Sequence, residues 1–403
     1  MRVLLATIGT RGDVQPVLAL AVRLREYGAP VRICAPPDFG DLISGFQLPF
    51  VPLGPHLRPT AERYMGEIPP DEPDRHRSTT IADQFTTLTV AAADCDVLVA
   101  CGALPVAARS VAEHRGIRYV AAVNCPIALP SCHHAPPPIP GPAAAPGIDN
   151  RALWFQETLR WNNIWDDALN AHRAAVGLDP VADVRPHVFT DRPLLAADPV
   201  LAPWPDPADP DVVQTGAWIL PDRRPLPAEL DAFLDAGEPP IYFGFGSTSV
   251  PVATSRVLIA AARALGRRAI FASGWADFDP VATAPDHIFI GEVNQQALFP
   301  RTAAVVHHGG AGTTFASARA RTPQVVVSET GDERLQVYDQ SYWARRVDDL
   351  GIGLMHPVAE PTVQSLTAAL DAALKPAMAA RARAVAATMR TDGAAIAAEY
   401  LIS

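Results

Sequence analysis

Short apolar runs alternate along the first part of the chain with longer segments whose apolar residues recur at helical spacing. The first run, "RVLLATIG", precedes a segment in which four residues share one helical face: Val17, Leu20, Ala21 and Leu24. Gly28 is expected to end this helix. The later runs hardly alternate, as in strands covered on both faces: "VRICAPP", "LPFVPLG", "CDVLVACG" and "RYVAAVNC". Strands separated by helix-length segments predict βαβ units and a parallel sheet.

The same pattern restarts in the second half of the chain. Strand candidates there are "PPIYFGFGS", "RRAIFASGW", "DHIFIGEV", "TAAVVHHGG" and "TPQVVVSE", most of them separated by helical segments such as "ATSRVLIAAARALG". We therefore predict two α/β domains of similar size, with a cleft between them. In such sheets ligands bind at the carboxyl ends of the strands.

Two proline-rich stretches interrupt these patterns. Residues 133–149 contain six prolines, which predicts a long exposed loop of the kind that is functional or disordered. Residues 201–225 are also rich in proline and predict an interdomain linker. Between the two stretches, Trp154, Trp161 and Trp165 lie on one face of a predicted helix. Core packing and a ligand-facing aromatic wall are both open for these rings.

Composition excludes several classes of protein. The chain of 403 residues has a formal net charge of -10 and no Lys/Arg block, which argues against a nucleic-acid backbone as partner. Its five cysteines form no CxxC pair and are expected to be small buried hydrophobes, so we predict no metal site and no cofactor. Neither a signal peptide nor a membrane-spanning run is recognisable, so a cytoplasmic protein is expected.

The segment "VVHHGGAGTT" predicts an anion site. A strand is expected to end near Val306 and a helix to begin near Thr313, with glycines that let the backbone approach a ligand closely. The N–H groups of the first helical turn would then face a phosphate, with added donors from His308, Thr313 and Thr314. A tight turn with a helix cap is the structural alternative. Neither a GxxxxGK[ST] loop nor a GxGxxG turn at strand-to-helix spacing occurs, which excludes a P-loop lysine and a nicotinamide dinucleotide.

In the first half, "GTRGD" follows the first strand and places Asp13 at the equivalent strand end. A carboxylate in a partly dry site is a general-base candidate for a hydroxyl nucleophile. The alternative is an N-cap for a helix that begins near Val14 or Pro16. Spacing alone leaves both interpretations open.

These segments together resemble the glycosyltransferases of the glycopeptide-antibiotic (vancomycin) group. The resemblance covers nearly the whole chain, and its most discriminating pieces are "QTGAWILPD" and "GEVNQQALF". It implies a GT-B fold, an α/β class with two Rossmann-like parallel-sheet domains that face each other across a cleft. The implied organisation is an acceptor domain at 1–200, the linker at 201–225, a donor domain at 226–385 and a C-terminal helix at 386–403 that packs back toward the first domain.

The resemblance also implies roles for individual residues. Asp13 corresponds to the family's proposed base, and Thr10 lies at its small hydroxyl position. The implied donor-binding residues are Arg11, Ser247, His308, Gly310, Gly312 and Thr313 for the diphosphate, Trp275, Val293 and Gln295 for the nucleoside, and Asp339 and Gln340 for the sugar. Many related glycosyltransferases place a histidine base after the first strand, and its absence here favours Asp13.

One segment departs from the family pattern. The stretch "VVVSETGDERLQVYDQ" is several residues longer than usual and carries extra charge, so Asp332 competes with Asp339 for the sugar-facing role. The donor sugar, and the choice of UDP or dTDP, therefore do not follow from the resemblance.

The expected activity is inverting, metal-independent transfer of a sugar from a nucleoside diphosphate-sugar to a hydroxyl of a natural-product aglycone, above all a glycopeptide heptapeptide. Three alternatives remain open: a sterol, lipid or other secondary-metabolite glycosyltransferase, a catalytically weak partner of another glycosyltransferase, and a sugar-nucleotide epimerase of the same architecture.

Overall fold

The computed structural model describes residues 1–57, 73–137, 147–205, 210–246, 252–274, 285–327, 339–356 and 361–403, with the backbone alone at 73–79 and 252–254. The chain divides into two compact units. Unit 1 comprises Met1–Pro136, Ala143–Leu220 and Arg390–Ser403, and unit 2 comprises Pro137–Pro142 and Pro221–Met389. No helix in the described parts of the chain is long and apolar enough to cross a membrane.

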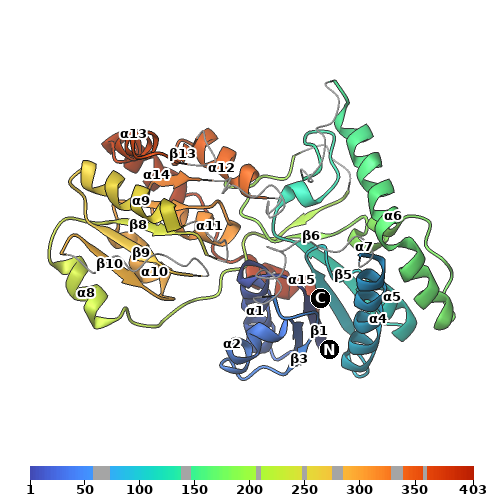
Figure 1. Ribbon diagram of the computed structural model, residues 1–403. Helices are drawn as coiled ribbons and strands as arrows, with labels where there is room; N and C mark the ends of the chain where they lie inside the picture. The colour runs from blue at the N-terminus through green and yellow to red at the C-terminus, as the bar shows by residue number, and fades with distance from the viewer. Residues whose placement is uncertain are drawn as a thin grey trace. The chain divides into compact units, whose positions relative to one another are not determined.

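Unit 1 is built on a parallel sheet of seven strands in the order β3-β2-β1-β4-β5-β6-β7 (Figure 1). Its strands are β1 (Val3–Thr7), β2 (Val31–Ala35), β3 (Phe50–Pro52), β4 (Val97–Cys101), β5 (Arg118–Val123), β6 (Leu194–Leu195) and β7 (Val213–Gln214). Its helices are α1 (Arg11–Glu26), α2 (Gly40–Ser44), α4 (Pro73–Ala91), α5 (Ala108–Arg115), α6 (Asn150–Ala175), α7 (Val184–Phe189) and α15 (Gly393–Ile402). The predicted parallel α/β pattern is thus confirmed for this half.

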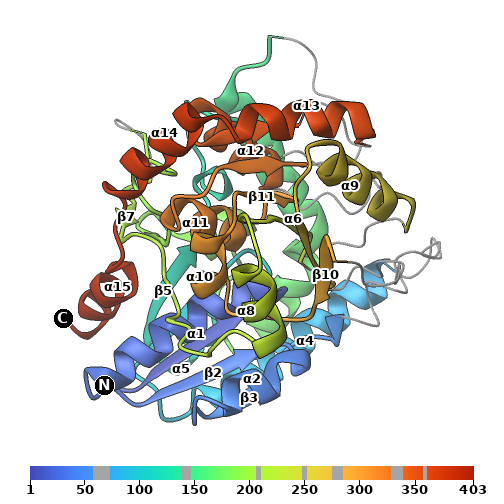
Figure 2. The same cartoon turned by 90° about the vertical axis from the view of Figure 1, so that its left-hand side faces the viewer.

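Helix α1 shows how the sequence pattern produces the core of unit 1. The four apolar residues predicted to share one face are fully buried, or nearly so, and pack with strand residues such as Val3 and Leu5. The chain leaves the helix through Gly28, whose positive φ of 80° suits glycine. The C-terminal helix α15 packs against α1 in the same core (Figure 2). Residues at the two ends of the chain therefore share one hydrophobic core.

Helix α1 begins earlier than the capping alternative assumed. It starts at Arg11, so Asp13 is its third residue, and Pro16 lies inside the helix. Proline is tolerated near a helix start because the first N–H groups lack intrahelical partners, but at the sixth position it costs one backbone hydrogen bond. The prediction of a start near Val14 or Pro16 was wrong because it treated Pro16 as a first-turn residue.

Unit 2 has a second parallel sheet of six strands in the order β10-β9-β8-β11-β12-β13. Its strands are β8 (Ile241–Gly244), β9 (Ala269–Ala272), β10 (His287–Ile290), β11 (Ala304–His307), β12 (Gln324–Val326) and β13 (Gly353–Met355). Its helices are α8 (Ala228–Asp235), α9 (Val252–Ala264), α10 (Gln295–Leu298), α11 (Ala311–Arg319), α12 (Gln340–Asp349), α13 (Val363–Ala373) and α14 (Pro376–Ala386). Both faces of this sheet are covered, because the neighbouring residues Tyr242 and Phe243 belong to different apolar clusters.

Three strands were not expected from the sequence. β6 and β7 contain two residues each, and the three residues of β13 stand in "GIGLMHP", where glycines and a proline interrupt the apolar run. β7 and the buried Trp218 fall in the 201–225 segment, of which residues up to Leu220 lie in unit 1. In this segment the chain adds an edge strand to the first sheet before it enters unit 2.

Candidate functional site

Asp13 stands on the first turn of α1, just beyond the carboxyl end of β1. Its Oδ2 accepts a hydrogen bond from the backbone N–H of Thr10 at 2.8 Å, and the Thr10 hydroxyl lies 3.5 Å from the same oxygen. The side chain therefore caps its own helix, where a negative charge is also favoured by the helix dipole. The capping and the base interpretations do not exclude each other, because a carboxylate has two oxygens and several lone pairs.

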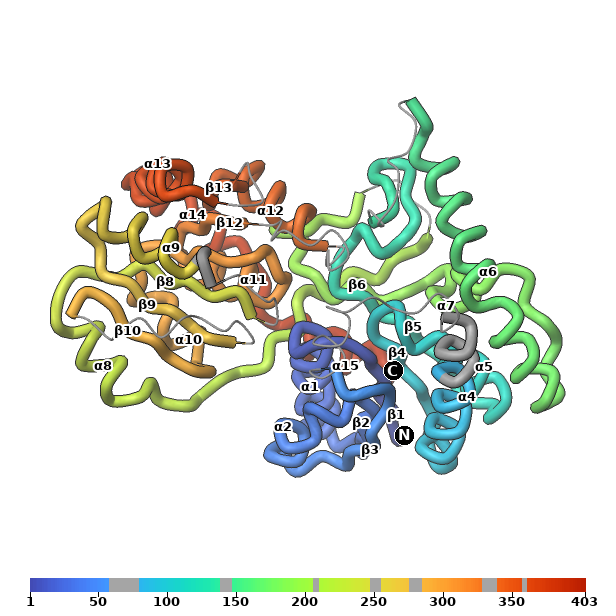
Figure 3. The backbone as a smooth tube through the Cα atoms, in the orientation of Figure 1, coloured from blue at the N-terminus to red at the C-terminus, as the bar shows by residue number. Residues whose placement is uncertain are grey.

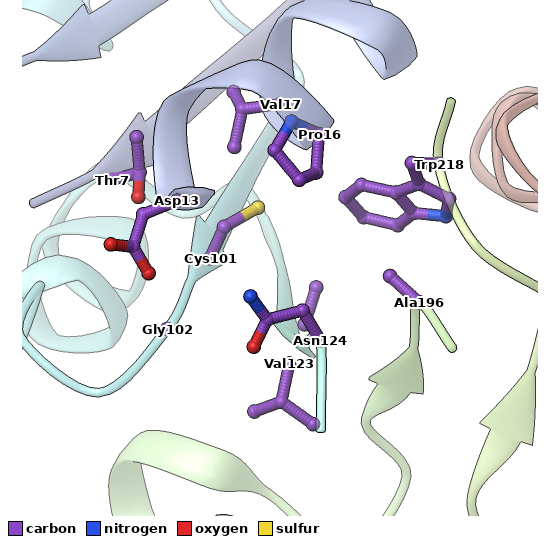
Figure 4. A pocket seen from close by; sticks show the side chains of 11 residues that line it. Thr7, Asp13, Pro16, Val17, Cys101, Gly102, Val123, Asn124, Ala196 and Trp218 are labelled. Atoms are coloured by element: carbon purple, nitrogen blue, oxygen red, sulfur yellow. The ribbon is translucent and has the colours of Figure 1, made fainter. Parts of the chain in front are cut away.

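A small cavity of about 20 Å³ adjoins this carboxylate (Figure 4). It is lined by Thr7 and Cys101, the last residues of β1 and β4, by Asn124, which follows β5, and by Asp13 of α1. Thr7 is fully buried, and its Oγ1 has no hydrogen-bond partner among the described residues. A space of this size holds roughly one water-sized group. The cavity thus places an acid, a hydroxyl and an amide around room for one small polar group.

The pKa of the Cys101 thiol is affected by its burial in this cavity and by the charge of Asp13. Burial, together with the nearby negative charge of Asp13, raises the pKa of Cys101 to about 12. The thiol is therefore protonated at neutral pH and is no nucleophile. Among the groups that line the cavity, Asp13 is the one suited to accept a proton.

In unit 2, the turn between β11 and α11 has the expected strand-turn-helix form. Gly309 has a φ of 96° and Gly310 is the N-cap of α11. A Cβ at residue 309 would come within 2.9 Å of the Gln340 carbonyl oxygen, so the turn packs directly on the start of α12. Residue 309 requires glycine because the backbone turns left-handed there and has a close neighbour.

His307, the last residue of β11, holds this turn in place. Its Nδ1 accepts a hydrogen bond from the Gly309 N–H at 3.1 Å, and its Nε2 lies 2.9 Å from Oε1 of Gln324. Burial lowers the pKa of His307 to about 3, so the ring is neutral and carries its proton on Nε2. The pair of histidines in "VVHHGG" could have indicated this role, but His307 directly follows the apolar residues of the strand and was included in it.

His308 lies against the glycines that follow two strands of unit 2, β8 and β11. A Cβ at Gly246, which follows β8, would lie 3.1 Å from its Cε1, and one at Gly310 would lie 2.6 Å from its Nε2. Burial lowers the pKa of His308 to about 4, so the ring is neutral at pH 7. It can offer an anion one N–H group but no positive charge.

The two threonines of α11 differ in role. Thr313 is partly exposed in the first turn, near the exposed Gly312. Thr314 is fully buried, and its hydroxyl donates to the Gly310 carbonyl at 3.0 Å. The prediction that Thr314 adds a donor for phosphate was wrong, because this side chain turns back onto its own helix.

Asp339 and Gln340 stand at the start of α12. Asp339 accepts a hydrogen bond from Trp343 Nε1 at 2.9 Å, and Gln340 is buried. Burial raises the pKa of Asp339 to about 6. Because Gly309 contacts Gln340, the structure brings the two predicted sugar residues next to the predicted phosphate turn.

The nucleoside candidates lie around α10. Gln295 begins that helix, with its Nε2 3.5 Å from the Tyr242 hydroxyl, and Val293 is partly buried against the core. Asn294, between them, caps α10 by accepting the Ala297 N–H and donates to the carbonyls of Asp222 and Arg224. This anchor was not identified from the sequence, although Asn before a helix is a capping signal.

Four further residues were predicted to bind the donor. Ser247, Trp275 and Asp332 lie outside the described residues. Arg11 is the first residue of α1 and belongs to unit 1. The other diphosphate candidates that the structure describes belong to unit 2.

No metal centre is found within the described ranges, where no group of three or more His, Cys, Asp and Glu side chains could hold an ion. Next to Cys132, the ring of His134 hydrogen-bonds through Nε2 to the Leu129 carbonyl at 2.9 Å. The described site residues thus provide a carboxylate in unit 1 and a helix N-terminus suited to an anion in unit 2.

Two known families match parts of the chain. Residues 3–128 match the family described as glycosyltransferase family 28 N-terminal domain. Residues 258–398 match the family described as erythromycin biosynthesis protein CIII-like, C-terminal domain. The first match lies within unit 1, and the second lies in unit 2 except for residues 390–398, which belong to unit 1.

Individual proteins match over the whole length. The vancomycin aglycone glucosyltransferase of Amycolatopsis orientalis is 50% identical over 100% of this chain and 97% of its own. The dTDP-epi-vancosaminyltransferase of the same organism is 44% identical over 96% of this chain and 93% of its own. Among solved structures, the glycotransferase of kitacinnamycin has the same fold, with a TM-score of 0.74 at 20% identity over 100% of this chain and 98% of its own.

Proposed function

The chain belongs to the glycosyltransferase family that includes the vancomycin aglycone glucosyltransferase of Amycolatopsis orientalis, and on this premise we propose that it glycosylates a glycopeptide heptapeptide with inversion at the anomeric carbon. The donor is a UDP- or dTDP-linked sugar, and the acceptor group is a hydroxyl. The observation that carries the proposal is the Asp13 carboxylate, held by the Thr10 N–H and facing a small, mainly apolar cavity.

Asp13 is the general base of this reaction. The acceptor oxygen attacks the anomeric carbon, its proton passes to Asp13, and the bond from the anomeric carbon to the diphosphate oxygen breaks with its electron pair left on the diphosphate. A base in this position contributes on the order of 10²–10⁴ to the rate. Thr10 fixes the carboxylate through its backbone N–H, and its hydroxyl lies nearby.

The leaving diphosphate binds at the start of α11. Unpaired N–H groups of the first turn and the positive end of the helix dipole stabilise the developing charge without a divalent cation. The neutral ring of His308, the Thr313 hydroxyl and the backbone at Gly310 and Gly312, which carries no side chain, complete the described part of this site. Arg11 and Ser247 are further proposed ligands of the diphosphate.

Two further groups of residues bind the rest of the donor. Trp275, Val293 and Gln295 bind the nucleoside, and Asp339, Gln340 and Asp332 bind the sugar hydroxyls. The close approach of Gly309 to Gln340 supports this division, because Gly309 belongs to the proposed phosphate turn and Asp339 and Gln340 begin α12.

The heptapeptide acceptor is favoured over a sterol by the high identity to the vancomycin aglycone glucosyltransferase along the whole chain. The test is to incubate the purified protein with UDP-glucose or dTDP-glucose and either a heptapeptide aglycone or a sterol. We expect a glycosylated aglycone with the anomeric configuration opposite to that of the donor, measured from the proton coupling constant of the product. A sterol glucoside alone would overturn the acceptor, and a retained configuration would overturn the mechanism. Release of an altered sugar from donor alone would indicate an epimerase.

A further inference from the structure

A second hollow, of about 250 Å³, lies in unit 1 between α6 and α7. The two helices run side by side (Figures 1 and 3). Trp154, Phe155 and Thr158 line the hollow from α6, and Arg185 and Phe189 line it from α7. It is thus an aromatic hollow with one cationic side chain in its wall, which is unusual because unpaired charges are seldom buried.

Arg185 is held in an aromatic cage. Its guanidinium carbon lies 4.5 Å from the ring centre of Trp154, 4.7 Å from that of Phe189 and 6.0 Å from that of Trp161. Only 4% of the residue is exposed. Its one described hydrogen bond runs from Nη2 to the carbonyl oxygen of Ala128. The rings hold the guanidinium in a fixed place, and four of its five N–H groups are not engaged in this bond.

No carboxylate lies within ion-pair distance of Arg185 in the part of the chain that the structure describes. Glu157 acts on it electrostatically, but its oxygens accept hydrogen bonds from Arg160 at 2.5 and 2.7 Å and from Trp161 Nε1 at 2.9 Å. Burial accordingly lowers the pKa of Arg185 to about 10. A buried cation that borders a hollow and lacks its own counter-ion is complementary to an anionic ligand.

We propose that this hollow binds a carboxylate carried beside an aromatic or other flat apolar group of the acceptor. The guanidinium offers N–H donors in the plane that matches a carboxylate, and the exposed ring of Phe155 offers an apolar face for the group that bears it. This inference rests on the proposed function and adds to it a site for recognition of the acceptor's acidic end.

The hollow lies within reach of the cavity beside Asp13. Asn124 lines that cavity and Pro130 lines the hollow, and only six residue steps separate them. Their Cα atoms are therefore at most about 22 Å apart, a distance that the six steps of an extended peptide of seven residues can also span. One acceptor can present a hydroxyl at Asp13 and a carboxylate at Arg185.

Phe155 provides the least disruptive test, because 64% of it is exposed. Leu159, on the same helix and 45% exposed, does not line the hollow and is the matched control. For Phe155→Ser we expect the KM for the heptapeptide aglycone to rise about tenfold, with the KM for the sugar donor and kcat unchanged. For Leu159→Ser we expect less than a twofold change. Equal effects of the two variants would overturn the proposal.

The charge is tested with the aglycone and its methyl ester as paired probes, by calorimetric binding as well as by transfer. We expect the wild type to bind the free acid about tenfold more tightly, and Arg185→Met to bind both alike while it keeps its melting temperature within a few degrees. A wild type that does not distinguish acid from ester overturns the site, whatever the folding of the Arg185 variant. Sugar transfer to the acid and the ester with equal affinity for both would contradict this inference but not the proposed function. Tighter binding of the acid without any sugar transfer would contradict the proposed function but not the carboxylate site.

Discussion

The carboxylate of Asp13 packs directly against the backbone of Gly9, so that a Cβ at residue 9 would overlap the Oδ2 and Cγ atoms of Asp13. The backbone N–H of Thr10, the residue after Gly9, donates a hydrogen bond to the same Oδ2. Gly9 and Thr10 therefore fix the position of the Asp13 carboxylate. Residue 9 must be glycine not only for the turn but also to leave room for this carboxylate.

Gly9→Ala should displace this carboxylate. We expect kcat to fall on the order of 10²-fold, because displacement of a reacting group by about 1 Å has effects of that size. Gly12→Ala is the matched control, since a Cβ there would meet only the Thr10 Oγ1 atom at 3.8 Å. Steady-state kinetics of both variants check the prediction. Equal loss in both would mean that the loop as a whole, and not the Asp13 carboxylate, matters.

Replacement of His307 should weaken donor binding without removing the chemistry. In His307→Leu the Gly309 N–H loses its partner, and we expect the KM for the donor to rise about tenfold, the equivalent of roughly one hydrogen bond. His307→Asn places an amide oxygen near the position of Nδ1 and should restore most of the affinity. Calorimetry with the nucleoside diphosphate and a melting curve for each variant separate binding from stability. An Asn variant as weak as the Leu variant would contradict the positioning role.

Donor binding should also depend on pH through Asp339. Burial raises the pKa of this carboxyl to about 6, so it becomes protonated as the pH falls through that value and then accepts hydrogen bonds from sugar hydroxyls less well. We expect the KM for the donor to rise between pH 7 and pH 5 in the wild type. Asp339→Asn should lack this dependence, with a higher KM throughout. A pH profile that is the same in both proteins would exclude Asp339 from the sugar site.

Nucleoside diphosphate binding should not require a divalent cation. The start of α11 supplies the positive potential, and the neutral His308 supplies a donor. Titration with UDP and dTDP should give the same affinity with and without EDTA, and NAD should not bind. Loss of binding in EDTA would show that a metal ion, and not the helix start, compensates the phosphate charge.

Much of the fold could be predicted from the sequence because long apolar runs reveal buried strands. The runs that contain β1 to β5 and β8 to β12 were all recognisable, and the glycines of "HHGGAGTT" marked the turn before α11. β6, β7 and β13 were not, since β6 and β7 have only two residues each and glycines and a proline interrupt the apolar residues around β13. Their place depends on pairing with strands distant in the sequence, which a local pattern does not contain.

The candidate site was predictable in the same uneven way. Residues with a strong local signal, such as Asp13 and Gly310, could be placed on a strand end or a helix start. His307 and Arg185 could not, because their roles depend on partners far along the chain: Gln324 for the first, Trp154 for the second. Thr314 shows the opposite error, a polar residue in the right segment that bonds to its own helix.

The central claim is that Asp13 is the base and not only a helix cap, and Asp13→Asn separates the two. The asparagine oxygen can still accept the Thr10 N–H, so the cap remains, whereas loss of a cap costs about 1 kcal/mol of stability. The side chain no longer takes up a proton. We predict that kcat for sugar transfer falls by about 10²–10⁴ while the affinity for UDP or dTDP and the melting temperature stay within error of the wild type. Transfer at the wild-type rate in this variant would show that Asp13 serves the helix alone.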